Sequence, residues 1–436
     1  MPETIAAPSV PQPAREFNAA VVALGKIGLP LAVQIAAAGH TVVGVDIDER
    51  VVAQVNAGEP PFPGEAGLAE ALKTLVDAGR LRATTDPANA IPQADLVIAV
   101  PPLVVDSEGV PDWRAIDAVV GAVGPHLSAG SCFALETTVP VGTTRERIAP
   151  RLEELSGLEL GVELNVAFSP ERVFSGRIFA DLANYPKLVG GVTLACERRV
   201  AALYRDFLTA DVRELGSAEA AELTKLVETT YREVNIALAN EFAKYADRVG
   251  IDLGPVIDAA NSQPYSHVHR PGVAVGGHCI PVYPRFYLAG DPDAKLVAHG
   301  RIVNEEMPAH AIDLLERDLA PLAGKRVLVL GAAYRGGVRE TAFSGVFPLV
   351  KELEQRGATA QVVDPLYDAE ALAELGLPSW DGAPIDGAIL QADHAEYRAL
   401  TPEQVPGAQA VIDGRGTLDA AALGNAGIRV RRIGGG

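Results

Sequence analysis

A cysteine that follows two glycines is the residue of this chain best suited to covalent chemistry. Cys279 lies in a loop-like stretch, VAVGGHCIP (273–281). Glycines let other groups approach the backbone, and a thiolate is a strong nucleophile when its pKa is lowered. Cys132 and Cys196 lie in apolar or helical stretches, where a cysteine is usually a small buried hydrophobe. His278, beside Cys279, could lower the thiol pKa or could simply pack.

Two further groups of polar residues have spacings that fit catalysis. Lys225, Thr229 and Arg232 are at i, i+4 and i+7 of a predicted helix, so they share one face. Such a row is more often a solvated surface. Glu171 and Arg172 follow a Ser-Pro pair directly after an apolar strand, a common position for catalytic loops. Spacing alone does not join these groups into a mechanism.

The first predicted turn has the pattern of a dinucleotide-binding loop. It is the G-x-G-x-x-G fingerprint with alanine in the first position, Ala23-Leu24-Gly25-Lys26-Ile27-Gly28. Gly25 lets the backbone approach a pyrophosphate, Gly28 lets helix and strand pack closely, and the helix N-terminus supplies N–H donors. Asp46 ends the next strand, about 20 residues on, where a carboxylate accepts ribose hydroxyls and disfavours a 2′-phosphate. Together these features predict NAD as the cofactor.

Alternating strands and helices must position these residues. Short apolar runs predict strands at residues 19–24, 41–45, 94–100, 132–137, 166–168, 326–330, 360–363, 387–390 and 408–412. Helical patterns lie between them at residues 29–38, 66–78, 115–127 and 345–354. Strand–helix alternation of this kind is typical of parallel, doubly wound sheets. The sequence therefore predicts an α/β protein with one such domain at each end.

A long helix is predicted between the two α/β regions. Residues 217–248 contain no Pro or Gly, and their apolar residues recur with a 3.6-residue period. Ser217 fits an N-cap and Gly250 fits a helix stop. The fold class is thus two doubly wound Rossmann-like domains joined by a long central helix. The terminal glycines, residues 434–436, are expected to fray.

Length and composition indicate a folded globular protein. The chain has 436 residues, enough for two or three domains, with 48% hydrophobic and 21% charged residues. Its net charge of −19 argues against nonspecific binding to nucleic acid, whose phosphates need a basic surface. A site for a small anionic ligand needs only a few local donors, so such a ligand is not excluded.

The sequence also predicts the cellular compartment of the protein. Residues 1–15 are rich in Ala and Pro and lack a basic start with an apolar core, which predicts a flexible tail and no signal peptide. No apolar run is long enough to span a membrane. The three cysteines form no C-x-x-C pair. We therefore expect a cytoplasmic protein with reduced thiols, without membrane or nucleic-acid partners.

Several segments, in order along nearly the whole chain, carry a family resemblance. They are GKIGLPLA (25–32), PFPGEAGL (61–68), RLRATTD (80–86), ETTVPVGTT (136–144), SPERVFSG (169–176), KLVETTYREVNIALANE (225–241), GGHCIPV (276–282), GAAYR (331–335), DHAEY (393–397) and DGRG (413–416). From about residue 19 to 416 the chain resembles the UDP-glucose/GDP-mannose dehydrogenase superfamily. GGHCIPV and SPERV in this order are specific to it.

The resemblance implies a domain plan and partners. We expect a tail at 1–15, an NAD-binding Rossmann domain at 16–200, a central helical dimerisation domain with the catalytic cysteine at 201–310, and a UDP-sugar-binding Rossmann-like domain at 311–436. It also implies a nucleotide-sugar substrate and a homodimer or higher homo-oligomer. The resemblance further implies that the product is a uronic acid used to build a cell-surface polysaccharide.

The resemblance also implies a reaction, the oxidation of a sugar C6 alcohol to a carboxylate in two hydride transfers to NAD. Cys279 would form a thiohemiacetal that is oxidised to a thioester, and Lys225 would stabilise the oxyanion. Glu171 would act as general acid/base in hydrolysis. Thr138 would help to hold the water, and Thr229 would lie near the thiol.

Binding residues are carried over in the same way. Those implied for the cofactor are Gly25, Lys26, Ile27, Gly28, Asp46, Val100, Pro101, Glu136 and Thr137. Those implied for phosphates or sugar are Ser169, Arg172, Arg232, Asn235, Arg270, Gly276, Tyr334, Arg335 and Arg339, with Arg415 as a further candidate. In relatives a basic residue of the 265–270 loop reaches the partner subunit's substrate, and either Arg270 or His269 could do so here.

The chain departs from the family pattern at four places. Ala23 replaces the first fingerprint glycine, and Thr229 replaces the Asn of K-L-x-x-N. Tyr283 replaces the Asp of C-x-x-x-D, and the segment after Tyr334 is shorter than usual and lacks its Asp. Tyrosine is a poor base at neutral pH, with an unperturbed pKa of roughly 10. We therefore expect Lys225 and Glu171 to carry more of the chemistry.

The sequence leaves alternatives for the substrate and for the class of function. The 225–241 segment resembles the branch that oxidises UDP-N-acetylmannosamine or UDP-N-acetylglucosamine, and we prefer a UDP-N-acetylhexosamine over UDP-glucose or GDP-mannose. A two-electron dehydrogenase or epimerase needs no thiol, so Cys279 argues against one. An inactive nucleotide-sugar sensor is a rival of another class. His267 and His269 lack accompanying metal ligands, so no metal is expected.

Overall fold

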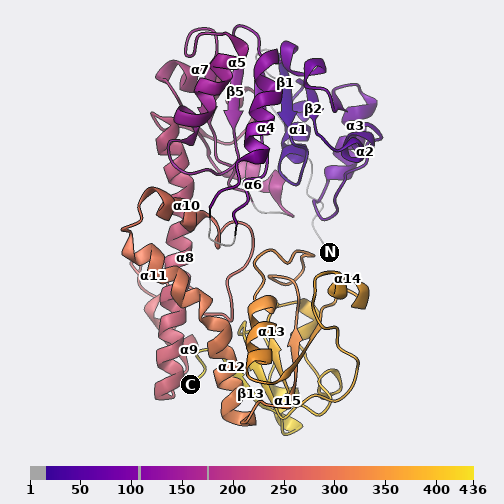
Figure 1. Cartoon of the computed structure of the whole chain (residues 1–436), viewed down its shortest axis with the longest axis vertical. Coiled ribbons are helices and arrows are strands. Elements are labelled where there is room, and N and C mark those ends of the chain that lie inside the picture. The colour runs from indigo at the N-terminus through magenta and orange to yellow at the C-terminus, as the bar shows by residue number, and fades with distance from the viewer. Residues whose placement is uncertain (1–15, 107–109, 174–175) are drawn as a thin grey trace. The chain divides into compact units, whose positions relative to one another are not determined.

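The computed structural model describes residues 16–106, 110–173 and 176–436 (Figure 1). The chain divides into two compact units, residues 1–227 and 228–436, and each is described by itself. The predicted tail at 1–15 and two residues of the SPERVFSG segment lie outside the described residues.

An eight-stranded sheet forms the centre of the first unit, in the order β3-β2-β1-β4-β5-β6-β7-β8. Its strands are β1 Asn18–Val22, β2 Thr41–Val45, β3 Leu81–Thr84, β4 Leu96–Ala99, β5 Cys132–Leu135, β6 Asn165–Phe168, β7 Lys187–Gly191 and β8 Val212–Glu214. Neighbouring strands are parallel except β6 and β7. The order from β3 to β6 is that of doubly wound dinucleotide-binding domains, and it confirms the predicted fold class.

Helices cover the first sheet because its strands are apolar on both faces. They are α1 Gly28–Ala37, α2 Glu49–Asn56, α3 Leu68–Asp77, α4 Arg114–Val123, α5 Ala149–Ser156, α6 Ile178–Asn184 and α7 Leu194–Phe207. Every residue of β4, β5 and β6 is buried. The main core joins α1, α3 and α7 to the sheet through Ile35, Leu72 and Tyr204, among others. This packing fixes the sheet edge from which the candidate catalytic loops leave.

The antiparallel strand β7 was not predicted. It pairs Ala167 with Gly191 and Phe168 with Gly190. Because β7 runs against β6, its first residue, Lys187, lies at the edge where β5 and β6 end. A short run with two glycines carries no periodic signal, so this reversal is invisible in the sequence.

The predicted long helix is confirmed as α8, Ala218–Val249, a continuous helix of 32 residues. Its observed limits differ by one residue from the predicted 217–248. The division between the two units falls within this helix, after Val227.

Further helices and a second sheet make up the rest of the second unit. The helices that precede the sheet are α9 Leu253–Ala260, α10 Tyr283–Gly290, α11 Lys295–Glu305 and α12 Met307–Leu319. The strands, all parallel, have the order β10-β9-β11-β12-β13. They are β9 Arg326–Leu330, β10 Thr359–Val363, β11 Gly387–Leu390, β12 Ala410–Asp413 and β13 Arg429–Arg432, with helices α13 Val346–Gln355, α14 Ala369–Glu374 and α15 Ala421–Asn425. The predicted second parallel domain is therefore confirmed.

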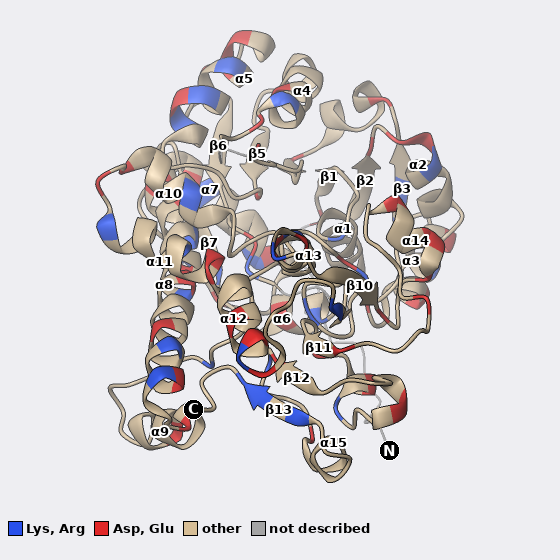
Figure 2. Ribbon diagram, turned by 60° about the horizontal axis from the view of Figure 1, so that its bottom comes forward, with Lys and Arg blue, Asp and Glu red and all other residues tan. Residues whose placement is uncertain are grey.

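The end of the chain is docked, so the expectation that residues 434–436 fray is wrong. The amides of Gly434 and Gly436 donate to the Asp247 carboxylate of α8. The strand before them, β13, is rich in arginine, as Figure 2 shows. Arg431 of this edge strand pairs with Asp318 of α12 at 2.6 Å. Charged side chains on an edge strand disfavour pairing with other chains.

The first predicted strand is shorter than expected because of Ala23. The residue adopts a φ of 73°, in the left-handed region that favours glycine, and the strand ends at Val22. Alanine takes the conformation of the first fingerprint glycine because the turn requires it. An L-residue there costs roughly 1–2 kcal/mol.

We expect Ala23→Gly to stabilise the first unit. Relief of the left-handed strain, less the entropy that glycine adds to the unfolded chain, should give about 1 kcal/mol, or about 2–4 °C in the thermal midpoint of a domain of this size. Scanning calorimetry measures it. The matched control is Ala57→Gly, at an exposed position with a φ of −81°, which should lower the midpoint. Equal destabilisation by both substitutions would contradict the proposed backbone strain at Ala23.

Candidate active site

The first turn has the geometry of a dinucleotide cradle. A Cβ on Gly28 would lie 2.0 Å from the carbonyl oxygen of Ala23, so only glycine fits there. A Cβ on Gly25 would meet none of the described atoms within 4 Å, so the space over the turn is open. The Leu24 amide donates to Asp46 Oδ2 at 2.7 Å, and the Asp48 amide donates to Asp46 Oδ1 at 3.0 Å. These bonds fix the half-buried Asp46 carboxylate beside the turn.

The N-terminus of α1 is suited to a phosphate. Ile27 is its N-cap residue, and among the described residues no side chain caps it and no acid lies in its first turn. Uncapped N–H groups and the helix dipole favour an anion at this position. Lys26, which precedes the helix, is exposed.

The cradle continues over the ends of β4 and β5. Val100 follows β4, and its amide donates to Val22 O at 2.9 Å. Thr137 follows β5, and its hydroxyl donates to the carbonyl oxygen of Pro101. The structure thus brings the predicted cofactor residues that follow β1, β2, β4 and β5 to one sheet edge. These residues fit NAD, which supplies a hydride acceptor when bound.

Glu136, predicted as a cofactor contact, is buried in a polar cluster. Its Oε2 accepts a hydrogen bond from Lys187 Nζ at 2.8 Å, and its Oε1 accepts one from the Tyr204 hydroxyl. Lys187 Nζ also donates to Glu171 Oε2 at 3.0 Å and lies 5.3 Å from the centre of the Tyr204 ring. Both oxygens of Glu136 are therefore engaged by protein groups, and its contact with the cofactor stays a prediction.

The loop after β6 joins Glu171 to the long helix. Lys225 Nζ of α8 donates to the main-chain carbonyl oxygen of Glu171 at 2.6 Å. The Arg172 amide donates to Glu171 Oε1 at 2.6 Å, and the Arg172 guanidinium donates to Pro186 O. Ser169 is fully buried, and its hydroxyl donates to Leu188 O. The structure thus brings together Glu171 and Lys225, while Ser169 and Arg172 contact the backbone around Lys187.

Burial and charge set the ionisation of this cluster. Burial raises the pKa of the Glu136 carboxyl to about 7, although the Lys187 charge opposes the shift. Burial also acts to raise the pKa of Glu171, but the Lys187 charge and the hydrogen bonds from Lys187 and Arg172 outweigh it and hold that pKa below its usual value. Desolvation acts to lower the pKa of Lys187, and the two carboxylates more than reverse it. At neutral pH, Glu171 is ionised and Lys187 is charged.

Glu222 is a buried residue of α8 that the sequence analysis missed. Its carboxylate accepts hydrogen bonds from the amides of Gly142 and Thr144, at 2.6 and 2.8 Å, and from the Thr144 hydroxyl at 2.6 Å. Burial raises the pKa of Glu222 to about 7. These bonds tie the loop that begins with buried Thr138 to the helix turn that carries Lys225. Glu222 thereby fixes the position of two predicted site residues.

In the second unit, Cys279 lies in the turn that leads into α10. It is exposed, and its carbonyl oxygen accepts hydrogen bonds from the amides of Val282 and Tyr283 at 3.2 and 2.9 Å. His278 is exposed and lies 3.3 Å from Glu340 Oε2, which does not support packing of its ring in a core. Cys279 belongs to the second unit, and Glu171 and Lys225 to the first, so their joint action stays a prediction.

The glycine pair before Cys279 allows a close approach by the last domain. A Cβ on Gly276 would lie 2.7 Å from Cβ of Tyr334 and 2.9 Å from the carbonyl oxygen of Phe343. Gly277 has a φ of 93°, and its amide donates to Ala342 O. The pair is therefore required for the cysteine loop to pack on the segment after β9.

The predicted arginines of the last domain have different surroundings. Arg335 Nε donates to the Tyr334 hydroxyl at 3.0 Å, and Arg339 Nε donates to Leu366 O at 3.0 Å, both side chains being exposed. Arg415 is half-buried, and its guanidinium donates to Ala274 O, Tyr334 O and two oxygens of Gln391. Arg415 thus ties the cysteine loop to the sheet, a structural role that the sequence did not indicate.

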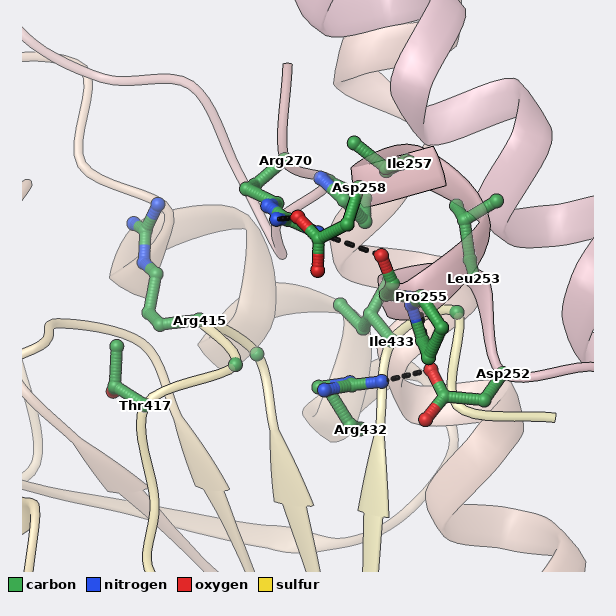
Figure 3. Close-up of a pocket in the computed structure, with 15 residues that line it drawn as sticks. Asp252, Leu253, Pro255, Ile257, Asp258, Arg270, Arg415, Thr417, Arg432 and Ile433 are labelled. Atoms are coloured by element: carbon green, nitrogen blue, oxygen red, sulfur yellow. Dashed lines mark hydrogen bonds and ion pairs between the residues drawn. The ribbon is translucent and has the colours of Figure 1, made fainter. Parts of the chain in front are cut away.

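Arg270 lines a pocket of about 570 Å³ at the ends of β12 and β13 (Figure 3). Its guanidinium pairs with Asp258 and donates to Gly254 O at 3.0 Å. Across the pocket, Arg432 pairs with Asp252. Both arginines already have protein partners, so their availability to a phosphate stays a prediction. Burial lowers the pKa of His269, the alternative residue of this loop.

The remaining predicted residues lie on α8. Thr229 is buried and Arg232 is exposed, so their row is not uniformly solvated. The Asn235 amide donates to Tyr231 O, one turn earlier in the helix. Glu233, between them in sequence, is fully buried and lies 3.0 Å from Arg301 of α11. This part of the helix is anchored by a buried charge pair.

Comparison with known proteins assigns the family. Three domain models of one family match in sequence order: the NAD binding domain of the UDP-glucose/GDP-mannose dehydrogenase family at residues 17–208, its central domain at 219–305 and its UDP binding domain at 328–420. The chain belongs to the UDP-glucose/GDP-mannose dehydrogenase family. The predicted family and the predicted cofactor, NAD, are confirmed, and the chain is an NAD-dependent nucleotide-sugar dehydrogenase.

Similar proteins cover nearly the whole chain. UDP-N-acetyl-D-mannosamine dehydrogenase of Pyrococcus horikoshii is 34% identical over 416 residues, 93% of this chain and 97% of the relative. An NDP-N-acetyl-D-galactosaminuronic acid dehydrogenase of Ralstonia solanacearum is 32% identical, over 92% and 96% of the two chains. The solved structure of the Pyrococcus horikoshii UDP-D-ManNAc dehydrogenase matches with a TM-score of 0.85 at 32% identity, over 96% and 99%.

Two further findings on the described residues concern membrane spans and metal sites. No helix in the described parts of the chain is both long and apolar enough to cross a bilayer. The same residues hold no group of three or more His, Cys, Asp or Glu with the arrangement of a metal site.

The Asp46 geometry gives a test of cofactor choice in this dehydrogenase. We expect Asp46→Asn to raise the KM for NAD about tenfold and to reduce the preference for NAD over NADP, because a charge-assisted acceptor becomes neutral. Initial rates with each cofactor measure both effects. The matched control is Asp48→Asn, since Asp48 caps α2 and asparagine caps equally well. The same loss in both variants would show that Asp46 does not select the cofactor.

Proposed function

We propose that this dehydrogenase oxidises the C6 alcohol of a UDP-N-acetylhexosamine to the carboxylate by a four-electron reaction through a thioester on Cys279. The observation that carries the proposal is the contact of Lys225 Nζ with the carbonyl oxygen of Glu171 at 2.6 Å. The contact joins a cation that is suited to stabilise an oxyanion to the residue whose carboxylate is suited to act as a base. Bound NAD accepts the hydride in each oxidation.

The cysteine separates the reaction into easier steps. The alcohol is first oxidised to the aldehyde. Sγ of Cys279 then bonds to the aldehyde carbon, and the oxyanion that forms is stabilised by Lys225 and by one hydrogen bond from Thr229. Loss of a second hydride converts the thiohemiacetal to a thioester. Exposure of Cys279 in a turn before a helix supports its access to substrate.

Hydrolysis releases the product. Glu171 takes a proton from a water that Thr138 helps to hold, as the water oxygen bonds to the thioester carbon. The C–S bond breaks, and the thiolate of Cys279 recovers a proton. The Glu222 contacts support this role, since they hold the Thr138 loop beside the helix turn of Lys225. Ser169, Arg172, Arg232, Asn235, Arg270, Gly276, Tyr334, Arg335 and Arg339 remain proposed contacts of the nucleotide sugar.

UDP-N-acetylmannosamine is the preferred substrate within this class. The Pyrococcus horikoshii relatives are named for that substrate, and their similarity extends over all three domains. The Ralstonia solanacearum relative is named for an N-acetylgalactosaminuronic acid, which is also an acetamido sugar. UDP-glucose and GDP-mannose are the alternatives.

NADH yield tests the reaction. With limiting UDP-N-acetylmannosamine and excess NAD, we expect two NADH per sugar from the wild type and at most one from Cys279→Ser, because the second oxidation needs the thiol. The matched control, Cys196→Ser, changes a buried cysteine and should keep two. One NADH per sugar in the wild type, or two from Cys279→Ser at an unchanged rate, would refute the thioester. UDP-N-acetylglucosamine, UDP-glucose and GDP-mannose in turn identify the sugar.

We also propose that the enzyme is a homodimer that buries one face of α8. In the second unit this helix exposes large apolar side chains one or two turns apart, at Tyr231, Leu238, Phe242, Tyr245 and Val249. An apolar stripe on a long helix is suited to pack against a second copy of the same helix.

A charge in the stripe should separate the dimer. We expect Phe242→Lys with Tyr245→Lys to give the mass of a single 45.6 kDa chain by light scattering, where the wild type gives at least twice that mass. Glu241→Lys, at an exposed position on the adjacent face, is the matched control and should leave the mass unchanged. A wild-type monomer, or a double variant that stays dimeric, would contradict the proposed interface.

A further inference from the structure

Lys187 has an unusual position for a lysine. Its side chain is 5% exposed, and its ammonium lies between two carboxylates, 2.8 Å from Glu136 Oε2 and 3.0 Å from Glu171 Oε2. The antiparallel direction of β7 places it there, at the edge where β5 and β6 end. Lysine is rarely buried unless its charge is paired.

The two carboxylates and the ammonium between them do not balance when all three are ionised. Glu136, Glu171 and Lys187 leave one excess negative charge at a buried site, which is unfavourable, and the nearby cations Arg172 and Lys225 contact the Glu171 residue. One proton shared by the two carboxylates removes that excess. Glu136 is the better place for it, because Glu136 is fully buried with Tyr204, whereas Glu171 also accepts the Arg172 amide at 2.6 Å.

We propose that Lys187 is the positioning residue that keeps Glu171 ionised for thioester hydrolysis, while Glu136 and Tyr204 behind it hold the exchangeable proton. The inference rests on the proposed role of Glu171 as general base. It gives Glu136 a role beneath the cofactor site in place of a direct contact with the cofactor.

The proton balance of the step follows from this arrangement. Ionised Glu171 accepts one proton from water as the water oxygen bonds to the thioester carbon. The C–S bond breaks, its electron pair leaves with Sγ of Cys279, and the proton passes from Glu171 to that thiolate. The acid product loses its own proton to solvent. Lys187 keeps its proton throughout, because Glu136 retains an acceptor for it when Glu171 is neutral.

Among the described residues, the ionisable groups joined by hydrogen bonds around Glu171 and Lys187 enter the pH dependence. From the ends of β5 and β6, from β7, from α7 and from α8, these groups are Glu136, Glu171, Arg172, Lys187, Tyr204 and Lys225. Burial raises the pKa of Glu136 to about 7 and that of Tyr204 well above its usual value, so Glu136 is the member that titrates near neutrality. Ionisation of Glu136 above pH 7 makes Glu171 a stronger base by repulsion.

The first test replaces the charge of Lys187. In Lys187→Met, burial of Glu171 is uncompensated, so its pKa rises and it is neutral at the assay pH. We expect kcat to fall about 100-fold, with the KM values for sugar and NAD within about twofold of the wild type. Both oxidations should still occur once, so that a burst of two NADH per site precedes slow turnover and an acyl group on Cys279 appears in the mass of acid-quenched enzyme. Lys187→Arg restores the charge and should recover most of kcat.

The second test follows pH in variants that keep Lys187. The kcat profile of the wild type should show an inflection at about pH 7, and Glu136→Gln should remove it. Tyr204→Phe removes a hydrogen bond that lowers the pKa of Glu136, so the inflection should move to higher pH. A merely structural cluster would lower the thermal midpoint in all of these variants without moving the inflection.

The outcomes separate this inference from the proposed function. If Cys279→Ser still gives two NADH per sugar, the thioester reaction is wrong and the inference fails with it. If Cys279→Ser stops at one NADH, while Lys187→Met hydrolyses the acyl-enzyme at the wild-type rate, only the inference is overturned. An inflection that Glu136→Gln leaves in place overturns the proton assignment to Glu136.

Discussion

Buried carboxylates at the edge of the first sheet set the conditions for everything around them. Parallel strands end at one edge, where the acidic residues that follow β5 and β6 have little water to solvate them and Asp46, which follows β2, is half-buried. Each therefore needs donors from the protein. Asp46 is held by two main-chain amides, Glu136 by Lys187 and Tyr204, and Glu171 by Lys187 and the Arg172 amide. The donors fix loop positions as much as they satisfy charges.

The same interaction recurs in the second sheet with a different result. Asp364, after β10, accepts the Ala332 amide at 2.7 Å and the Leu366 amide at 2.8 Å, as Asp46 accepts those of Leu24 and Asp48. Asp364 is buried, however, and His394 Nε2 lies 3.1 Å from its Oδ2. The His394 side chain thus occupies the space beside Asp364 in which a ribose would have to bind. The turn is shared by both domains, but only in the first does its acid remain accessible.

Local patterns predicted a large part of this structure. The limits of β9 and β11 and nearly all of α8 follow from apolar periodicity, because strand and helix repeats lie within one segment. The family and the cofactor followed from motifs at fixed spacing. Lys187, Tyr204 and Glu222 were missed because their contacts join residues 16 to 80 positions apart, and no repeat in the sequence records such pairings. The motif of Arg415 does not reveal the four backbone and amide oxygens to which its guanidinium donates, and its contact with a ligand stays a prediction.

The replacement of the family's usual aspartate by Tyr283 explains why this chain needs the buried Lys187 beside Glu171. The Tyr283 ring packs against Phe286, 5.8 Å between centres, and a phenol is a poor base at neutral pH. Proton transfer in the proposed hydrolysis then depends on Glu171, which is itself nearly buried. A buried carboxyl works as a base only if a fixed positive charge offsets its lost solvation. Lys187 supplies that charge, and Glu136 keeps an acceptor oxygen 2.8 Å from the ammonium when Glu171 is neutral. A chain without the aspartate therefore has a stronger need for this cluster than one that retains it.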